Sequence, residues 1–239
     1  RDWMEHMVDE GNSPASVSRR LSAIKMFYRF ALARKFVESD PARRIKGPKK
    51  GKQLPQFLKE SQMDELLDRQ KWGCDYKDVR ARTIIMMFYE TGMRLSELVN
   101  LDDGDVNLVN REIKVTGKGN KQRIVPFGDE LEKTIREYLA LRDQTLDCHS
   151  EAFMLSEGGG RMSPESIRCI VKENLAKVCS LKKKSPHVLR HTFATAMLNH
   201  NAGIENLKKL LGHAKLSTTE IYTHTTFEQL KRVYNKAHP

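Results

Sequence analysis

The sequence contains few cysteines, and they do not form a disulfide or metal-binding pattern. The 239-residue chain has four of them, Cys74, Cys148, Cys169 and Cys179, without a C-x-x-C spacing. Small secreted domains that depend on disulfides carry a much denser cysteine framework. We therefore expect reduced thiols in a cytoplasmic protein.

Long apolar runs are also missing. No stretch approaches the roughly 20 apolar residues that cross a bilayer, and no secretory signal precedes the first predicted helix. Hydrophobic residues still make up 39% of the chain, which is enough for packed cores and argues against disorder. The sequence predicts one or two ordinary domains without a membrane partner.

Acidic residues are outnumbered by basic ones. Lys and Arg number 42 against 31 Asp and Glu, so the formal net charge is +11. Such an excess favours a polyanionic partner, most often nucleic acid, although a merely solvated basic surface is the alternative. Residues 1–53 hold 13 basic and 6 acidic residues. This first part is the main candidate for a nucleic-acid contact.

Residues 1–46 predict a small helical domain. A helix is expected over 2–9, and because residue 1 lies directly before it, we expect this domain to lack its natural start. Ser13-Pro14 is typical of a helix start. Apolar residues then recur at helical spacing and predict a core stripe of Val17, Leu21, Ile24, Tyr28 and Ala31. The opposite side either contacts phosphates or is only solvated, and it carries Arg19, Ser22, Lys25 and Arg29.

A basic linker follows. The stretch RRIKGPKKGKQLP, residues 43–55, has six basic residues and no acidic ones, with prolines and glycines that favour an extended chain. A cationic tether can follow a phosphate backbone, and a plain hinge is the alternative. We predict a linker at 47–56 and DNA contacts from Arg43, Arg44, Lys49 and Lys50.

Residues 57–239 predict a second, larger domain that is mainly α with a small antiparallel β-sheet. Helices are expected from a Ser61 cap to about residue 69, and over 77–92. The period then changes within 105–127, where alternating apolar residues around two turns predict three antiparallel strands. Further helices are expected at 129–143, 163–179, 186–200, 204–211, 218–223 and 227–236.

The stretch SPHVLRHTFATAML, residues 185–198, combines a helix start with groups that suit phosphate chemistry. Ser185 is expected to cap a helix that Pro186 opens. His187 and Arg190 are three residues apart, so they share one face of the first turn, where free N–H groups and the helix dipole favour an anion. Arg190 offers a two-pronged donor, and His187 can move protons near neutral pH.

The same stretch also permits a metal pair, since His187 and His191 are four residues apart. The zinc-protease pattern needs a Glu after the first His, and Val188 stands there instead. No cysteine completes a site. We predict no metal and expect His191 to be a structural, hydrogen-bonded histidine.

Three further stretches carry polar residues at turns. Gly212 is expected to end a helix and to leave His213 on a bend, and a capping box at 217–220 would place Tyr222 on a short helix. Arg94 follows the helix-ending Gly92, with Glu97 close enough to orient it. Lys118 lies between glycines in a turn. Taken singly, these residues could be a packed tyrosine, a surface ion pair and a hairpin tip.

Together, the stretches TGMRLSELVNL, GKGNKQRIVP, HVLRHTFAT and LLGHAKLSTTEIYTH resemble the tyrosine recombinase (phage integrase) family, in the order and spacing of that family. The residues of these stretches are most similar to those of the Xer branch, the compact site-specific recombinases of bacteria. The resemblance covers nearly all of residues 57–224 and implies a helical core-binding domain followed by a mixed α/β catalytic domain.

The resemblance implies a metal-free and cofactor-free mechanism with six residues. Tyr222 would attack a DNA phosphodiester and form a 3′-phosphotyrosyl link. His187 would be the general base and Lys118 the general acid. Arg94, Arg190 and His213 would stabilise the pentavalent phosphate.

The resemblance also implies partners. A homo- or hetero-tetramer would act on a double-stranded recombination site in two duplexes, through a Holliday junction, with a possible accessory protein. The protein would be cytoplasmic and nucleoid-associated. Its last helix would dock on a neighbouring protomer in the assembly, and docking on its own domain is the alternative. A type IB topoisomerase that relaxes one duplex, and a non-catalytic DNA-binding module, are the alternatives.

Overall fold

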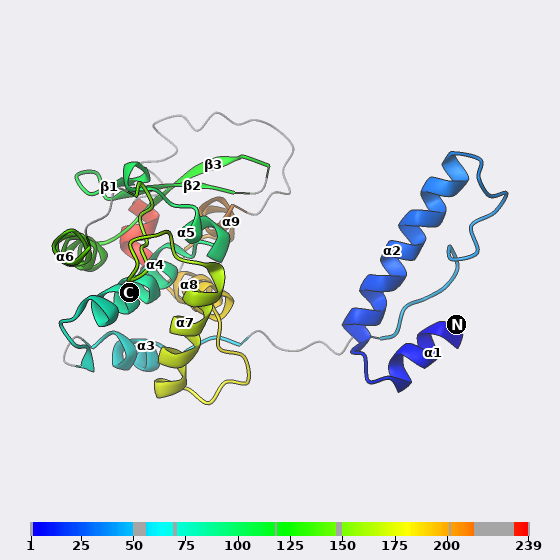
Figure 1. The fold of residues 1–239 in the computed structure, drawn as a ribbon, viewed down its shortest axis with the longest axis horizontal. Coiled ribbons are helices and arrows are strands. Elements are labelled where there is room, and N and C mark those ends of the chain that lie inside the picture. The colour runs from blue at the N-terminus through cyan, green and yellow to red at the C-terminus, as the bar shows by residue number, and fades with distance from the viewer. Residues whose placement is uncertain are drawn as a thin grey trace. The chain divides into compact units, whose positions relative to one another are not determined.

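The computed structural model of the chain describes residues 2–49, 56–68, 71–117, 119–146, 150–200, 202–212 and 232–238 (Figure 1). Its internal contacts divide the chain into two compact units, Arg1–Leu54 and Pro55–Pro239. The predicted class, mainly helical with a small antiparallel sheet, is confirmed.

The first unit consists of two helices, α1 (Asp2–Asp9) and α2 (Pro14–Ala33). The hydroxyl of Ser13 accepts a hydrogen bond from the Ser16 N–H at 3.2 Å, so the predicted cap forms. Of the predicted stripe, Val17, Leu21 and Ala31 are buried, whereas Ile24 and Tyr28 are only half-buried. Other apolar side chains of this unit are more than half exposed, namely Met26, Phe27, Phe30 and Phe36.

The second unit is built around α4 (Tyr76–Thr91), which is buried along almost its whole length. Three longer helices contact it, α6 (Asp129–Thr145), α7 (Pro164–Val178) and α8 (Pro186–Asn199), and α3 (Glu60–Leu67) packs on α7 (Figure 1). The short α5 (Leu95–Val99) also contacts α7. The predicted helices agree with α3, α4, α6, α7 and α8 to within a few residues, whereas α5 was not predicted.

One predicted cap is wrong, and a second is confirmed in position but lacks its hydrogen bond. Lys59, not Ser61, precedes the first turn of α3, because the Gln62 side chain reaches back and accepts the Lys59 N–H at 3.0 Å. Ser185 stands at the N-cap position of α8, but its side chain makes no capping hydrogen bond to that first turn, which lies within the described residues.

A three-stranded antiparallel sheet follows α5, as predicted. After a short 3₁₀ turn, η2 (Asp103–Asp105), the strands β1 (Val106–Asn107), β2 (Glu112–Thr116) and β3 (Gln122–Pro126) pair in the order β1-β2-β3. Side chains alternate between the two faces of a strand. Accordingly Ile113, Val115 and Val125 are buried while Ile124 is exposed.

The C-terminal part of the unit packs on a second apolar cluster. Helix α9 (Ile204–Leu211) ends at Gly212, which has a φ of 62° and so adopts the left-handed conformation that favours glycine. A helical segment at 232–237 returns to this cluster, where Tyr234 is buried. The cluster consists of Phe193, Met197, Ala202, Leu207, Leu210, Leu211, Tyr234 and Ala237.

In this single chain, residues 232–237 therefore pack on their own unit. The predicted docking of the tail on a neighbouring protomer concerns the assembled protein and stays a prediction. The predicted helix at 218–223 and the first part of that at 227–236 lie outside the described residues.

Each helix that the structure describes is too short or too polar to serve as a membrane span. Cys74, Cys169 and Cys179, the cysteines within the described ranges, are free thiols.

Candidate active site

Arg94 is held at the end of the central helix. Gly92 caps α4 with a φ of 59°, and Arg94 then occupies the N-cap position of α5. The Arg94 N–H donates to Glu97 Oε2 at 2.7 Å, and its Nη1 donates to Glu97 Oε1 at 2.9 Å. The predicted orientation of Arg94 by Glu97 is therefore present, and 38% of the Arg94 side chain remains exposed.

Arg190 lies deeper than Arg94. It projects from α8, whose neighbouring Leu189 and Phe193 are fully buried, as predicted. Its Nη1 donates to the carbonyl of Gly92, and its Nη2 donates to the carbonyl of Leu211 at 2.7 Å. Arg190 thus joins the end of α4 to the end of α9.

Three arginines meet the C-terminal end of α9. Arg190 contacts Leu211, Arg94 Nη2 donates to the Gly212 carbonyl at 3.2 Å, and Arg123 Nε donates to the Leu210 carbonyl at 2.7 Å. The last carbonyls of a helix lack intrahelical partners and carry partial negative charge, which these guanidinium groups satisfy. The chain then continues to His213, so both predicted catalytic arginines contact the backbone just before that residue.

Glu97 organises two of these arginines. Its carboxyl is buried and receives hydrogen bonds from both Nη atoms of Arg123 and from Arg94. Burial alone would raise its pKa, but the hydrogen bonds and charge of Arg123, with those of Arg94, lower the pKa below the ordinary glutamate value. Glu97 is therefore an ionised carboxylate at neutral pH.

His187 lies at the exposed start of α8, and its ring meets the ring of His191 edge-on, with centroids 4.8 Å apart. Partial burial lowers the pKa of His187, and the charges of His191, Arg190 and Arg94 lower it further. A neutral imidazole near pH 7 can accept a proton. The site therefore offers a base beside two cations.

His191 departs from its prediction. Its side chain is exposed and contacts the ring of His187 instead of a hydrogen-bond partner among the described residues. The prediction of a structural, hydrogen-bonded histidine is wrong, because position 191 faces outward from α8.

Three of the six predicted catalytic residues, Lys118, His213 and Tyr222, lie outside the described residues, as does Lys50 of the predicted DNA-binding set. The structure does describe the chain next to two of them. The Gly117 N–H donates to the Lys121 carbonyl at 2.8 Å, and Gly212 directly precedes His213. The described residues thus bring together Arg94, His187 and Arg190.

The predicted DNA-binding residues of the first unit lie at its surface. Arg19, Ser22 and Arg29 are exposed on α2 and Lys25 is half-buried, while the Ser22 hydroxyl donates to the Ser18 carbonyl at 2.8 Å. In the segment after α2, the predicted DNA contacts Arg43, Arg44 and Lys49 are exposed as well. This exposure suits either a phosphate contact or solvation.

Arg123 was not among the predicted site residues, although the sequence contains a signal for it. Arg123 pairs with Val115 in the β2–β3 register, so the alternation of β3 directs it inward with Val125. A charged residue at an inward position of a strand needs buried partners. The pattern identifies such a position but not its partners.

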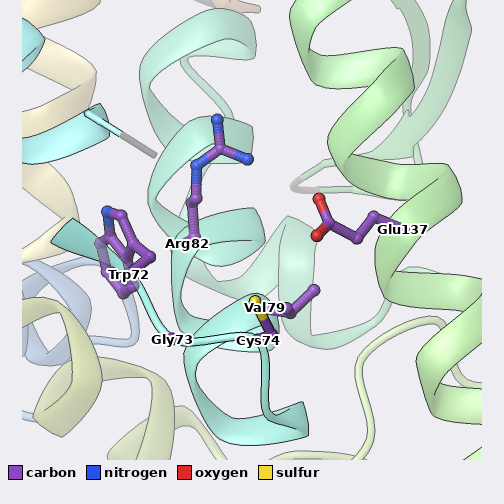
Figure 2. Close-up of a pocket in the computed structure, with 6 residues that line it drawn as sticks. All are labelled: Trp72, Gly73, Cys74, Val79, Arg82 and Glu137. Atoms are coloured by element: carbon purple, nitrogen blue, oxygen red, sulfur yellow. The ribbon is translucent and has the colours of Figure 1, made fainter. Parts of the chain in front are cut away.

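No group of His, Cys, Asp and Glu within the described ranges could hold a metal ion. A small hollow of about 60 Å³ lies elsewhere, beside α4 and α6, and the Glu137 carboxylate points from α6 toward α4 there (Figure 2). It is lined by Trp72, Gly73, Cys74, Val79, Arg82 and Glu137, none of which belongs to the predicted site.

Comparison with known proteins identifies the family of the chain. Residues 56–229 match the phage integrase family, and residues 1–35 match the phage integrase N-terminal SAM-like domain. The tyrosine recombinase XerC of Chlorobaculum parvum is 36% identical over 260 residues, which cover 100% of this chain and 77% of that protein.

Solved structures show the same fold. The crystal structure of XerA recombinase has a TM-score of 0.60 at 30% identity and covers 98% of this chain and 79% of that one. The XerH site-specific recombinase bound to difH substrate in a pre-cleavage complex has a TM-score of 0.68 at 21% identity, covering 95% and 63%. The chain belongs to the phage integrase family of tyrosine recombinases, and it resembles the Xer branch.

Proposed function

We propose that this chain is a site-specific DNA recombinase that cleaves and rejoins DNA strands through a phosphotyrosyl intermediate on Tyr222. The observation that carries the proposal is the meeting of Arg94 and Arg190 at the end of α9, beside His187 and directly before His213. Two guanidinium groups and a neutral imidazole suit a phosphodiester that gains negative charge as it is attacked.

Arg94 and Arg190 would stabilise the transition state. A guanidinium carries five N–H donors, and Arg94 uses Nη1 for Glu97 and Nη2 for Gly212. Its remaining donors and its exposed surface leave it able to bind the equatorial phosphate oxygens. Arg190 is more deeply buried. Its positive charge would act on the phosphate from within the protein, and its hydrogen bonds hold the ends of α4 and α9 together.

His187 would accept the proton of the attacking phenol. An ordinary tyrosine has a pKa of about 10, so it must lose its proton as it attacks. The lowered pKa of His187 keeps its imidazole neutral at pH 7. His213 would add a further hydrogen bond to the phosphate.

The reaction balances without a metal or a nucleotide. The Tyr222 oxygen bonds to phosphorus, the bond to the 5′-oxygen breaks, and Lys118 protonates that oxygen as it leaves. The 3′-phosphotyrosyl link retains the phosphodiester, and the 5′-hydroxyl of another strand can attack it in reverse. When one strand of each of two duplexes is cleaved and the two 5′-hydroxyls exchange partners, a Holliday junction results.

The partner is a double-stranded DNA recombination site, and we propose a homo- or hetero-tetramer on two duplexes with a possible accessory protein. Residues 1–46 would bind DNA through Arg19, Ser22, Lys25 and Arg29. The linker 47–56 would follow the backbone, and 57–239 would form the catalytic domain. Because its substrate is DNA, we place its activity in the bacterial cytoplasm.

Adduct formation tests the proposal. Duplexes that the protein binds are first selected from a random pool, and each is then nicked so that cleavage traps the protein. We expect a covalent adduct that maps to Tyr222, and Tyr222→Phe should bind the same duplex without forming it. Tyr234→Phe is the matched control and should form the adduct.

Three results would contradict the proposal. An adduct with Tyr222→Phe would exclude this nucleophile, and binding by the unaltered chain without any adduct would indicate a non-catalytic module. Relaxation of supercoiled plasmids that lack the selected site would indicate a type IB topoisomerase.

A further inference from the structure

Arg123 is a buried arginine in the middle of a β-strand. Only 8% of it is exposed, and it shares the inward face of β3 with Val125, which is fully buried. Removing a guanidinium from water is costly unless its donors are satisfied. Its partners therefore indicate what it does.

All three of its donor nitrogens are engaged. Nη1 and Nη2 donate to the two oxygens of Glu97 at 2.7 and 2.9 Å, and Nε donates to the Leu210 carbonyl at 2.7 Å. The guanidinium is planar and rigid, so a two-pronged pair fixes the position of the carboxylate relative to the arginine. The same plane fixes the end of α9.

Each partner of Arg123 leads to a residue of the proposed site. Glu97 also holds the N–H and Nη1 of Arg94. Leu210 lies three residues before His213, and a Cβ placed on Gly212 would lie 3.2 Å from the Arg123 side chain. The turn that leads to His213 thus packs directly on the guanidinium.

We propose that Arg123 is a positioning residue for strand cleavage, which fixes the end of α9 and, through Glu97, the orientation of Arg94. This inference rests on the proposed recombinase function. Arg123 itself does not contact the phosphate. It acts by keeping the phosphate-binding Arg94 and the backbone before His213 in one arrangement.

The test is Arg123→Lys, which keeps the positive charge beside Glu97 but cannot donate to both carboxylate oxygens and Leu210 at once. We expect unchanged binding to the selected duplex and an adduct rate, at saturating protein, that falls by about 100-fold, the scale of a misplacement of about 1 Å. An adduct rate equal to that of the unaltered chain would overturn the inference.

Arg142→Lys is the matched control. Arg142 is also buried, and its two Nη atoms donate to Asp103 at 2.8 and 2.9 Å and to the Phe153 carbonyl at 3.2 Å. The control loses the same kind of contacts away from β3 and α9, so it should lower the melting temperature without slowing the adduct rate. Equal slowing in both variants would show that Arg123 is only structural.

A sulfur substrate separates positioning of the phosphate from positioning of Lys118. Replacing the bridging 5′-oxygen by sulfur gives a leaving group with a pKa of about 8.5, which needs no proton donor. Arg123→Lys should stay slow on this substrate, whereas Lys118→Ala should recover. Recovery of Arg123→Lys would mean that it acts through the Lys118 turn, and would overturn the inference.

Further measurements separate a variant that fails to fold, a failure of the proposed function and a failure of this inference. If Arg123→Lys does not fold, the double variant Arg123→Met with Glu97→Gln removes both buried charges, and it too should bind DNA but form adduct slowly. If the unaltered chain forms no adduct on either substrate, the proposed function fails and the inference fails with it. An active unaltered chain beside an equally active Arg123→Lys refutes the inference alone.

Discussion

Gly92→Ala tests whether the junction between α4, α8 and α9 is as tightly packed as the structure shows. Gly92 has a φ of 59°, in the left-handed region. A Cβ added there would lie 2.8 Å from Cε1 of Phe193 and 2.9 Å from Cδ2 of Leu211. Both side chains are buried, so neither has free space into which it can move.

The expected loss of stability has two parts. The left-handed conformation costs a non-glycine residue about 1–2 kcal/mol, and overpacking of a filled core costs about 1–3 kcal/mol. Gly92→Ala should therefore lower the free energy of unfolding by about 2–5 kcal/mol. Gly119 has a φ of 76°, and an added Cβ would have no atom of the described residues within 4 Å, so Gly119→Ala should lose only about 1–2 kcal/mol.

Urea unfolding measures the difference. The chain has two tryptophans, and in a Trp3→Phe background the fluorescence of Trp72 reports on the second unit alone. The Trp72 indole donates to the Leu66 carbonyl at 2.8 Å, so unfolding changes its environment. If Gly92→Ala and Gly119→Ala lose the same free energy, the contacts of Gly92 with Phe193 and Leu211 do not constrain the fold as described.

Three further predictions follow from buried or perturbed groups. Burial raises the pKa of Glu90 to about 7, above its value in the unfolded chain, so the free energy of unfolding should fall by on the order of 3 kcal/mol between about pH 4.5 and 7. Glu90→Gln should abolish that fall in urea titrations, and an unchanged profile would contradict the assignment. The adduct rate should rise with pH with a midpoint below pH 6.5, because the pKa of His187 is lowered from 6.5; a midpoint above pH 6.5 would argue against His187 as the base. Tyr234→Ala removes a buried aromatic ring, worth about 3–5 kcal/mol, and should expose residues 232–238 to limited proteolysis; resistance equal to that of Tyr234→Phe would show that this ring does not hold the segment.

Local signals in the sequence predicted much of the fold. Gly92 and Gly212 end their helices because each takes up a left-handed conformation. Ser13 and Pro14 start α2 for equally local reasons. The alternation in 105–127 predicted the three strands, since one face of each strand must be buried. These predictions need no knowledge of distant contacts.

Other features depend on contacts that sequence spacing does not contain. Arg123 becomes part of the site only because β3 lies beside Glu97 and Leu210, far away in the chain. In α2, apolar residues occur on more than one side, so the pattern did not show that Phe27 and Phe30 would be exposed. Arg94, Arg190 and His187 were predicted from motifs, but the shared contact of the two arginines with the end of α9 came from the structure.

The enclosure of α4 has a consequence for engineering. The three helices with the most extensive contacts to α4, namely α6, α7 and α8, belong to the second unit. The carbonyl of Gly92 at its end holds Arg190, and Arg94 follows two residues later. The hydrogen bonds that set the spacing of this arginine pair therefore lie within the second unit. On the DNA contacts proposed above for residues 1–46, chimaeras that carry a different first unit should keep this arginine arrangement while binding other DNA sequences.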